Sequence, residues 1–370
     1  MPDTEPTPPD DEADDESEQA EAFPATTAIS YYGTDFDVDG LVRRLGKGDI
    51  VIPRFDPETK VGESLSGFQR RFVWRRFQMD RFIESLLLGF PIPGIFLVQQ
   101  PDKKMLVLDG QQRLITLQCF YNGLIDQNTV FALKDVADEF KDLKYKDLSD
   151  DLRRAIDNTF IHATIVKYDP TLGGDDAVYQ VFERLNTGGT NLYPQEIRVA
   201  LYNGEFTTML RSLNSDANWR ELYGPASLRH KDQELILRFI AFSYALDKYE
   251  RPLKGFLNKF LREHRHLENL QEQDIRGQFA LTCSAIKAGI GRRAFRAKQQ
   301  LNAALVDAIL VAVSSRLAKG PITDYHAMGV AFDGLLASED FLGLVTRSTS
   351  DEDRVKSRIN QASAAFTSVP

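Results

Sequence analysis

The sequence has few of the residues that crosslink small secreted proteins or bind metal ions. Its 370 residues include two cysteines, Cys119 and Cys283, which are too few for a disulfide framework or a structural zinc site. None of its five histidines has His-x-x-x-His spacing, and no cysteine and histidine are spaced as metal ligands. We therefore expect a protein of the reducing cytoplasm, without a disulfide framework or a structural zinc site.

Long apolar runs and targeting signals are also absent. No stretch approaches the roughly 18 consecutive apolar residues that a membrane-spanning helix needs, so we expect no membrane partner. The N-terminus is acidic and rich in proline, unlike a secretory signal or a transit peptide. Neither a Walker A sequence nor a G-x-G-x-x-G run occurs, which excludes these two schemes of phosphate binding.

Acidic residues are concentrated at the N-terminus. Residues 1–22 contain ten of the 54 acidic residues and none of the 45 basic ones, so the rest of the chain is close to neutral. This stretch has no aromatic residue and cannot bury enough apolar surface to offset the entropy lost on ordering. We predict a disordered tail at 1–28. It is either a solubilising leader or a polyanion mimic that screens a basic site.

Hydrophobic periodicity changes near residue 190. Before this point, strands are predicted at 49–53, 94–100, 104–108 and 160–168, and helices at 37–47, 78–88 and 111–123. After it, apolar residues recur every three to four positions over 194–213, 229–247, 253–264, 272–288, 299–317 and 351–366. The patterns predict an α+β protein, with a mixed α/β domain at 29–190 followed by an all-α domain at 191–370.

The segment with the most chemical information begins where a predicted strand ends at Asp109. A helix is expected directly after Gly110, and helix N-termini expose unpaired N–H groups with about half a positive charge. Gly110 lets the backbone approach a ligand closely, and Arg113 adds a permanently charged fork in the first turn. This combination suits an anion, most naturally a phosphate. Asp109 would then hold Mg²⁺ or orient water; in the alternative interpretation it only caps the helix.

An ordered series of segments carries a family resemblance. The series is 68–74 (Phe-Gln-Arg-Arg-Phe-Val-Trp), 83–86 (Ile-Glu-Ser-Leu), 91–93 (Pro-Ile-Pro), 109–113 (Asp-Gly-Gln-Gln-Arg), 182–189 (Phe-Glu-Arg-Leu-Asn-Thr-Gly-Gly), 195–198 (Gln-Glu-Ile-Arg) and, more loosely, 355–359 (Val-Lys-Ser-Arg-Ile). It resembles the N-terminal domain family of GmrSD-type, modification-dependent restriction systems over roughly 40–365. The resemblance implies a ParB/sulfiredoxin-like nucleotide-binding fold, in which the Asp-Gly-Gln-Gln-Arg motif binds and hydrolyses a nucleoside triphosphate.

The resemblance and the turn chemistry together define a set of candidate site residues. The catalytic candidates are Asp109, Gln112 and Arg113, with Asp109 also as the Mg²⁺ ligand. The residues expected to contact the nucleotide are Gln69, Arg70, Gly110, Gln111, Arg113, Asn186, Gly188 and Gly189. The base of the nucleotide stays open among GTP, ATP and CTP.

Two segments admit a structural interpretation beside the functional one. Arginines alternate with aromatic residues over 68–82, a pattern that can bind nucleic acid by phosphate pairing and base stacking. We expect its aromatic residues Phe72, Trp74 and Phe82 mainly to pack, and Arg70 or Arg71 to reach the phosphates.

The second of these segments follows the predicted helix that carries Phe182. Asn186 and the glycines at 188 and 189 would form a second wall of the nucleotide site, or Gly188 would simply end the helix in a left-handed conformation. Glu196 and Arg198 on the next helix could orient this loop or the Mg²⁺.

These observations favour an NTP-binding and NTP-hydrolysing sensor or regulatory component of a prokaryotic restriction or anti-phage defence system. No His-Asn-His type nuclease site is recognisable, so we do not expect this chain alone to cut DNA. Two alternatives remain: a DNA-binding or DNA-nicking component, and a catalytically silent partner that controls a separately encoded nuclease. The expected partners are a nucleotide, modified or foreign DNA, and such a nuclease.

Overall fold

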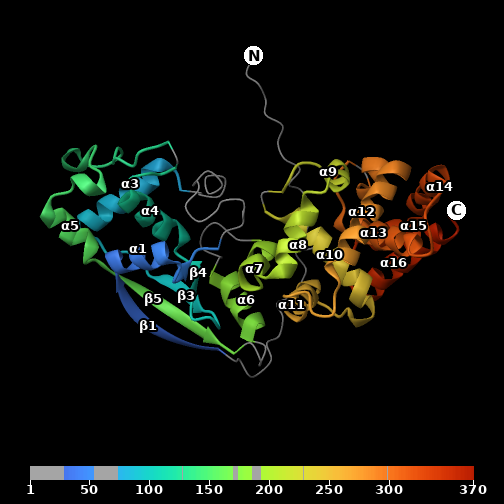
Figure 1. The fold of residues 1–370 in the computed structure, drawn as a ribbon, viewed down its shortest axis with the longest axis horizontal. Coiled ribbons are helices and arrows are strands. Elements are labelled where there is room, and N and C mark those ends of the chain that lie inside the picture. Colours follow the sequence, from blue (N-terminus) through green and yellow to red (C-terminus); the bar gives the residue numbers. More distant parts are fainter. Residues whose placement is uncertain are drawn as a thin grey trace, which may run out of the picture. The chain divides into compact units, whose positions relative to one another are not determined.

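The chain folds into two compact units. The computed structural model describes residues 29–53, 74–126, 128–169, 174–185, 193–227, 229–297 and 299–370. One unit ends at Leu192 and contains a five-stranded sheet, whereas Tyr193–Pro370 contains only helices among its described elements (Figure 1). The predicted α+β class is confirmed. The predicted disordered tail at 1–28 lies outside the described residues.

The sheet of the first unit is mixed. Its strands are β1 (Ile29–Asp37), β2 (Ile50–Val51), β3 (Ile95–Gln99), β4 (Met105–Asp109) and β5 (Phe160–Tyr168). In the order β1-β5-β3-β4-β2, the neighbouring pairs are antiparallel, parallel, antiparallel and parallel. The four strands predicted from the sequence are confirmed, although β2 is only two residues long. Strand β1 was not predicted, because its mainly exposed residues lack an alternating apolar pattern.

Helices cover both faces of this sheet. The helices are α1 (Val38–Lys47), α3 (Arg76–Leu87), α4 (Gln111–Asn122), α5 (Asp150–Asp157) and α6 (Gly174–Leu185), with short 3-10 turns at Asp138–Phe140 and Tyr145–Asp147. The first four lie together on one side of the sheet (Figure 1). Their apolar residues, such as Leu41 and Ile83, join Leu97 and Ile165 of the strands in one core. Helix α6 packs on β1, β4 and β5, and the predicted helices α1, α3 and α4 are confirmed.

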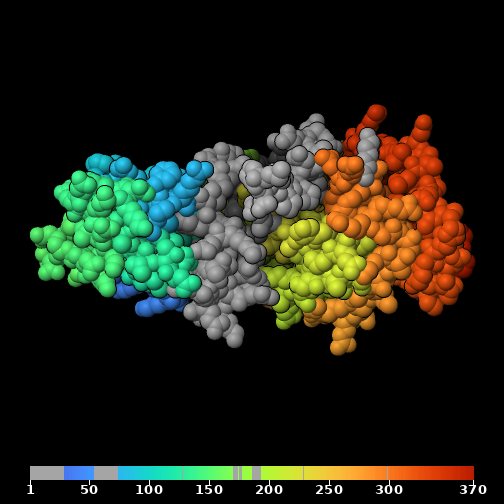
Figure 2. All heavy atoms as spheres, turned by 90° about the horizontal axis from the view of Figure 1, so that it is seen from above, coloured from blue at the N-terminus to red at the C-terminus, as the bar shows by residue number. Residues whose placement is uncertain are grey.

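The second unit is a bundle of helices. They are α7 (Pro194–Leu201), α8 (Glu205–Asn214), α9 (Ala217–Tyr223), α10 (Lys231–Ala245), α11 (Leu253–Glu263), α12 (Glu272–Gly289), α13 (Ala303–Leu317), α14 (Tyr325–Ala337), α15 (Glu339–Thr346) and α16 (Glu352–Thr367), with 3-10 turns at Leu246–Lys248 and Gly291–Phe295. Helices α10 and α13 are buried on nearly all sides. In the space-filling view, the orange and red surfaces of the later helices adjoin one another (Figure 2).

The single helix predicted over 194–213 is wrong, because α7 and α8 are separate. Gly204 is extended between them, and its N–H donates to Thr207 Oγ1 at 3.0 Å. A Cβ on Gly204 would lie 2.5 Å from the carbonyl oxygen of Arg265, so the backbone at this break passes close to a neighbouring segment. Helices α9, α14 and α15 were not predicted from the sequence.

Candidate functional site

The turn between β4 and α4 depends on Gly110. Strand β4 ends at Asp109, and Gly110 occupies the N-cap position of α4 with φ 93° and ψ 10°. This left-handed conformation favours glycine. A Cβ at Gly110 would also lie 2.4 Å from Cγ2 of Ile95 on the neighbouring strand. The strand, glycine and helix N-terminus predicted from the sequence are therefore confirmed at this place.

Asp109 forms an ion pair with Arg113 one helical turn later. Nη2 of Arg113 donates to Asp109 Oδ2 at 2.9 Å and to the carbonyl oxygen of Gly94 at 3.0 Å. The Asp109 side chain is 51% exposed, whereas that of Arg113 is 14% exposed. The carboxylate thus remains accessible to solvent, and the guanidinium is held in a fixed direction between strand β3 and the helix.

The capping role considered for Asp109 is wrong. The N-cap residue is Gly110, and it makes no side-chain capping bond because it has no side chain. Asp109 lies one position earlier, where its carboxylate meets the guanidinium of Arg113 instead of a backbone N–H of α4. The contact with Gly94 was not foreseen either. The sequence marks the place of this contact only by a glycine that directly follows the prolines at 91 and 93.

Two buried donors at this helix N-terminus have no acceptor among the described residues. They are Nε2 of Gln111 and Nε of Arg113. A buried donor without an acceptor costs free energy, and native structures pair most such groups. The first backbone N–H groups of α4 add donors that the helix itself does not use. The first turn of α4 therefore carries several donors without a described acceptor, and such donors suit an anion.

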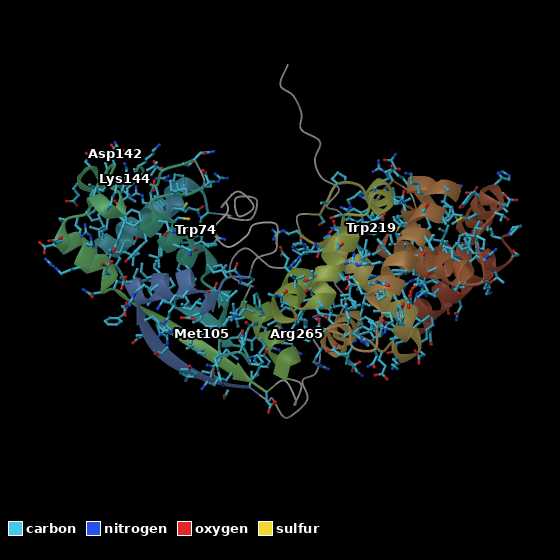
Figure 3. The ribbon with its side chains drawn as sticks, viewed as in Figure 1. Trp74, Met105, Asp142, Lys144, Trp219 and Arg265 are labelled. Atoms are coloured by element: carbon cyan, nitrogen blue, oxygen red, sulfur yellow. The ribbon has the colours of Figure 1, made fainter. Side chains whose placement is uncertain are left out.

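Gln112 contacts the segment that precedes α3. Its Oε1 accepts from the backbone N–H of Trp74 at 3.4 Å. The Trp74 ring packs edge-to-face on Phe82 with 5.5 Å between ring centroids, and Figure 3 labels Trp74 near α3. The prediction that Trp74 and Phe82 mainly pack is confirmed. The structure gives Gln112 a positioning contact, and its catalytic role stays a prediction.

Arg76 and Arg81 of the basic and aromatic segment pair with acidic residues of the chain. Nε of Arg76 lies 2.9 Å from Asp80 Oδ1, and its guanidinium stacks on the Phe131 ring at 4.6 Å from the centroid. Arg81 pairs with Glu84 at 2.8 Å. The two ion pairs lie within α3, and the contact with Phe131 ties α3 to the segment after α4, so these contacts favour a structural role for Arg76 and Arg81.

Several predicted site residues lie outside the described residues. They are Gln69 and Arg70 with the neighbouring Arg71 and Phe72, and Asn186, Gly188 and Gly189. Both interpretations of the loop after α6, as a second wall of the site or as a helix C-cap, therefore stay predictions. Helix α6 ends at Leu185, directly before this loop.

Glu196 and Arg198 have partners within the helical unit. Glu196 is buried and its Oε2 accepts from the backbone N–H of Tyr193 at 2.8 Å. Arg198 is also buried; it donates to Glu234 at 2.7 Å and to Asn258 at 2.8 Å. These bonds begin α7 and join it to α10 and α11. They give both side chains a structural role within the helical unit, where Glu196 also lies 3.6 Å from Nη1 of Arg229.

The thiol nearest to the site does not have the properties of a nucleophile. Cys119 lies on the buried side of α4, as the sequence predicted. Burial, and to a smaller extent the charge of Asp126, raises the pKa of this thiol to about 12. Because the thiolate is the reactive form, Cys119 is inert near neutral pH.

Metal ligands are sparse in the described part of the chain. Within residues 29–370 outside the gaps given above, no group of three or more His, Cys, Asp or Glu side chains could hold a metal ion. At this turn Asp109 supplies a carboxylate that is accessible to solvent. No helix among the described residues is long and apolar enough to cross a membrane.

Comparison with known families places this turn in a defined domain. Residues 53–203 match the family model described as the N-terminal domain of the GmrSD restriction endonuclease. The chain contains a GmrSD-type N-terminal domain. The matched range includes the β4–α4 turn and α7, and the family resemblance seen in the sequence is confirmed over this range. No curated protein matches the chain.

Proposed function

We propose that this protein is a component of a restriction or defence system whose first unit binds and hydrolyses a nucleoside triphosphate. The GmrSD-type domain supports the restriction setting. The nucleotide proposal depends on one observation: the unpartnered buried donors of Gln111 and Arg113 at the N-terminus of α4. A phosphate is a strong acceptor that would satisfy these donors, and the partial positive charge of the helix end favours it.

Arg113 is the principal phosphate ligand in this proposal. Its guanidinium already has a fixed direction, because one nitrogen bonds both Asp109 and the Gly94 carbonyl. A guanidinium can pair with two oxygens of a phosphate, and charge-assisted bonds of this kind are about twice as strong as neutral ones. A phosphate bound here would take the place of part of the Asp109 contact and would occupy the free Nε.

Asp109 fits a Mg²⁺ ion only together with the nucleotide. Protein sites commonly bind this ion through one or two carboxylates plus substrate phosphates and water, and Asp109 supplies one accessible carboxylate. When bound, the ion would neutralise negative charge on the phosphates. The carboxylate can also accept a hydrogen bond from water and so orient it toward a phosphorus atom.

A nucleotide panel tests this function directly. Purified protein would be mixed with ATP, GTP or CTP and Mg²⁺, and both its melting temperature and the released phosphate would be measured. A nucleotide present at about 100 times its dissociation constant should add about 2.7 kcal/mol to the free energy of unfolding. Absence of both stabilisation and turnover with every nucleotide would refute the proposal.

The partners proposed for this function follow from the restriction setting. They are modified or foreign DNA and a separately encoded nuclease, and the GmrSD-type domain supports both without distinguishing them. Co-purification with the product of a neighbouring gene, compared with binding to DNA over a range of salt concentrations, separates the two. A steep loss of DNA affinity with salt is expected if phosphate contacts dominate.

A further inference from the structure

Strand β1 forms one edge of the sheet along its whole length. Its nine residues pair with β5 in one unbroken antiparallel register, from Ile29 opposite Tyr168 to Asp37 opposite Phe160. Among the described strands β5 is its only neighbour. The opposite edge of the sheet is β2, which is two residues long. The sheet therefore has one long edge and one very short edge.

Several of the features that usually protect an edge strand are missing from β1. Natural edges carry lysine, proline, a bulge or an inward-pointing charge, which discourage pairing with another strand. Strand β1 contains no Lys, Arg or Pro, and its register has no bulge. Its two acids have local partners: Asp35 lies 2.8 Å from Nδ1 of His162, and Asp37 accepts from the backbone N–H of Gly40 at 2.5 Å.

Two of the exposed side chains of this edge, beside Ser30 and Asp35, are aromatic. Tyr31 is 77% exposed and Tyr32 is 38% exposed, on opposite faces of the strand. Phe160, on the neighbouring strand, is 68% exposed. A strand added beside β1 would cover parts of the two tyrosines and bond the outward backbone groups of β1.

We propose that β1 pairs antiparallel with β1 of a second copy of this chain, which makes a symmetric dimer with one continuous sheet. Full overlap of the two strands places the two-fold axis at Gly33. Tyr31 then lies opposite Asp35 of the partner subunit, and Tyr32 lies opposite Thr34 of the partner subunit. Asp35 and Asp37 then face Tyr31 and Ile29 of the partner subunit, so no like charges oppose the pairing.

The shape of the sheet explains why this pairing stops at two copies. A two-fold contact uses the same edge on both subunits and leaves nothing to extend the assembly. Growth into a fibre would require the other edge, and β2 offers only Ile50 and Val51 for pairing. A closed dimer is therefore the expected product of this edge.

The register predicts opposite effects for two charges at one exposed position. Tyr31→Glu places a carboxylate opposite Asp35 of the partner subunit, twice in each dimer, and should raise the dimer dissociation constant about tenfold. Tyr31→Lys places a cation there and should leave the constant unchanged or lower it. Tyr325→Glu is the matched control, because this tyrosine is half exposed at the start of α14.

Sedimentation equilibrium of the full chain and its variants over a concentration series measures these constants. Hydrogen exchange of the peptide that covers β1 should slow at concentrations where the dimer dominates. A monomeric wild-type chain at all concentrations would overturn the proposal. It would also fail if Tyr31→Glu had no effect, or if Tyr31→Lys weakened the dimer as much as Tyr31→Glu did.

Discussion

Arg238 and Asp307 form a two-pronged ion pair in the middle of the helical unit. Nε of Arg238 lies 3.0 Å from Oδ1 of Asp307, and its Nη2 lies 2.6 Å from Oδ2. Arg358 donates to the same Oδ2 at 3.0 Å, and the side chains of Arg358 and Asp307 are fully buried. One carboxylate thus joins helices α10, α13 and α16 and balances two guanidinium groups.

The first prediction concerns this carboxylate. Asp307→Asn removes the negative charge that the guanidinium groups of Arg238 and Arg358 share. Burial lowers the pKa of Arg358, and the charge of Asp307 acts against this effect. Loss of one partner from a buried pair typically costs about 3–5 kcal/mol, so the free energy of unfolding should fall by about this amount. Urea denaturation measures it, with Asp333→Asn as the control.

Asp333 is a suitable control because its ion pair with Arg293 is exposed. The variant Asp333→Asn should leave the denaturation midpoint unchanged within error. Equal midpoints for the two variants would show that burial of the Asp307 pair has no energetic consequence.

The second prediction concerns the glycine between β4 and α4. Gly110→Ala adds a Cβ that meets Ile95 and forces a left-handed conformation on alanine. The conformation costs about 1–2 kcal/mol, and overpacking adds about 1–3 kcal/mol. Gly123→Ala at the other end of α4 is the matched control, since φ is 73° there and no atom lies within 4 Å of the new Cβ.

Thermal unfolding of both glycine variants separates the two costs. The Gly123 variant should show only the conformational part, and the Gly110 variant should be clearly less stable and should lose nucleotide-dependent stabilisation. If Gly110→Ala unfolds at the same temperature as Gly123→Ala, the close approach of Gly110 to β3 is not required.

The third prediction concerns Asp109 and Arg113 in nucleotide turnover. Arg113→Ala should lower nucleotide affinity at least about tenfold, because charge-assisted hydrogen bonds contribute about 1.5–3 kcal/mol each. Arg113→Lys keeps the charge without the fork and should recover part of the affinity. Asp109→Asn should bind nucleotide and hydrolyse it slowly or not at all. Its stability should change little, because half of the carboxylate is exposed.

Equilibrium binding and phosphate release, with the melting temperature of each variant, check this series. The Gly94 contact makes some loss of stability expected for Arg113→Ala, so affinity must be compared with Arg113→Lys. Wild-type binding and turnover in all three variants would show that the nucleotide site is not at this turn.

The fourth prediction is a loss of stability at alkaline pH. The pKa of Cys119 is raised to about 12, and burial with the Asp157 hydrogen bond raises the pKa of Tyr145 to about 12 as well. In the unfolded chain these groups titrate near about 8.5 and about 10. The folded state therefore retains both protons more tightly. The stability that the two groups contribute to the free energy of unfolding is fully present below about pH 8.5. It is lost as the pH rises toward 12.

Melting temperatures between pH 7 and 11 measure this effect. Cys119→Ala should show a shallower alkaline decline than wild type, whatever its stability at pH 7. Identical declines would mean that the thiol does not contribute. A thiol reagent at pH 8 should react with native wild type far more slowly than with the unfolded chain.

Local sequence patterns predicted much of the first unit. Strand β5 and helix α4 were predicted within a residue, because apolar periodicity and the glycines at 110 and 123 mark their ends. Strand β1 was missed because an edge strand needs no regular apolar face. The break at Gly204 was missed because it depends on a close approach to Arg265, which is distant in sequence.

The candidate site was predicted in composition but not in arrangement. Residues 109–113 indicated an anion site, since a strand, a glycine and an arginine follow in the required order. That Arg113 bonds both Asp109 and Gly94 depends on the pairing of β3 with β4, which no local pattern encodes. The same is true of the contact between Gln112 and the backbone of Trp74.

The end of the family match has a practical consequence for exchanging domains between relatives. The match runs to residue 203 and so includes α7, yet α7 belongs to the compact unit that begins at Tyr193. A chimera joined after residue 203 would separate Arg198 from Glu234 and Asn258, its hydrogen-bond partners on α10 and α11. A transplant of the GmrSD-type domain should therefore include Glu234 and Asn258 as well. Alternatively, the junction should be placed before Tyr193.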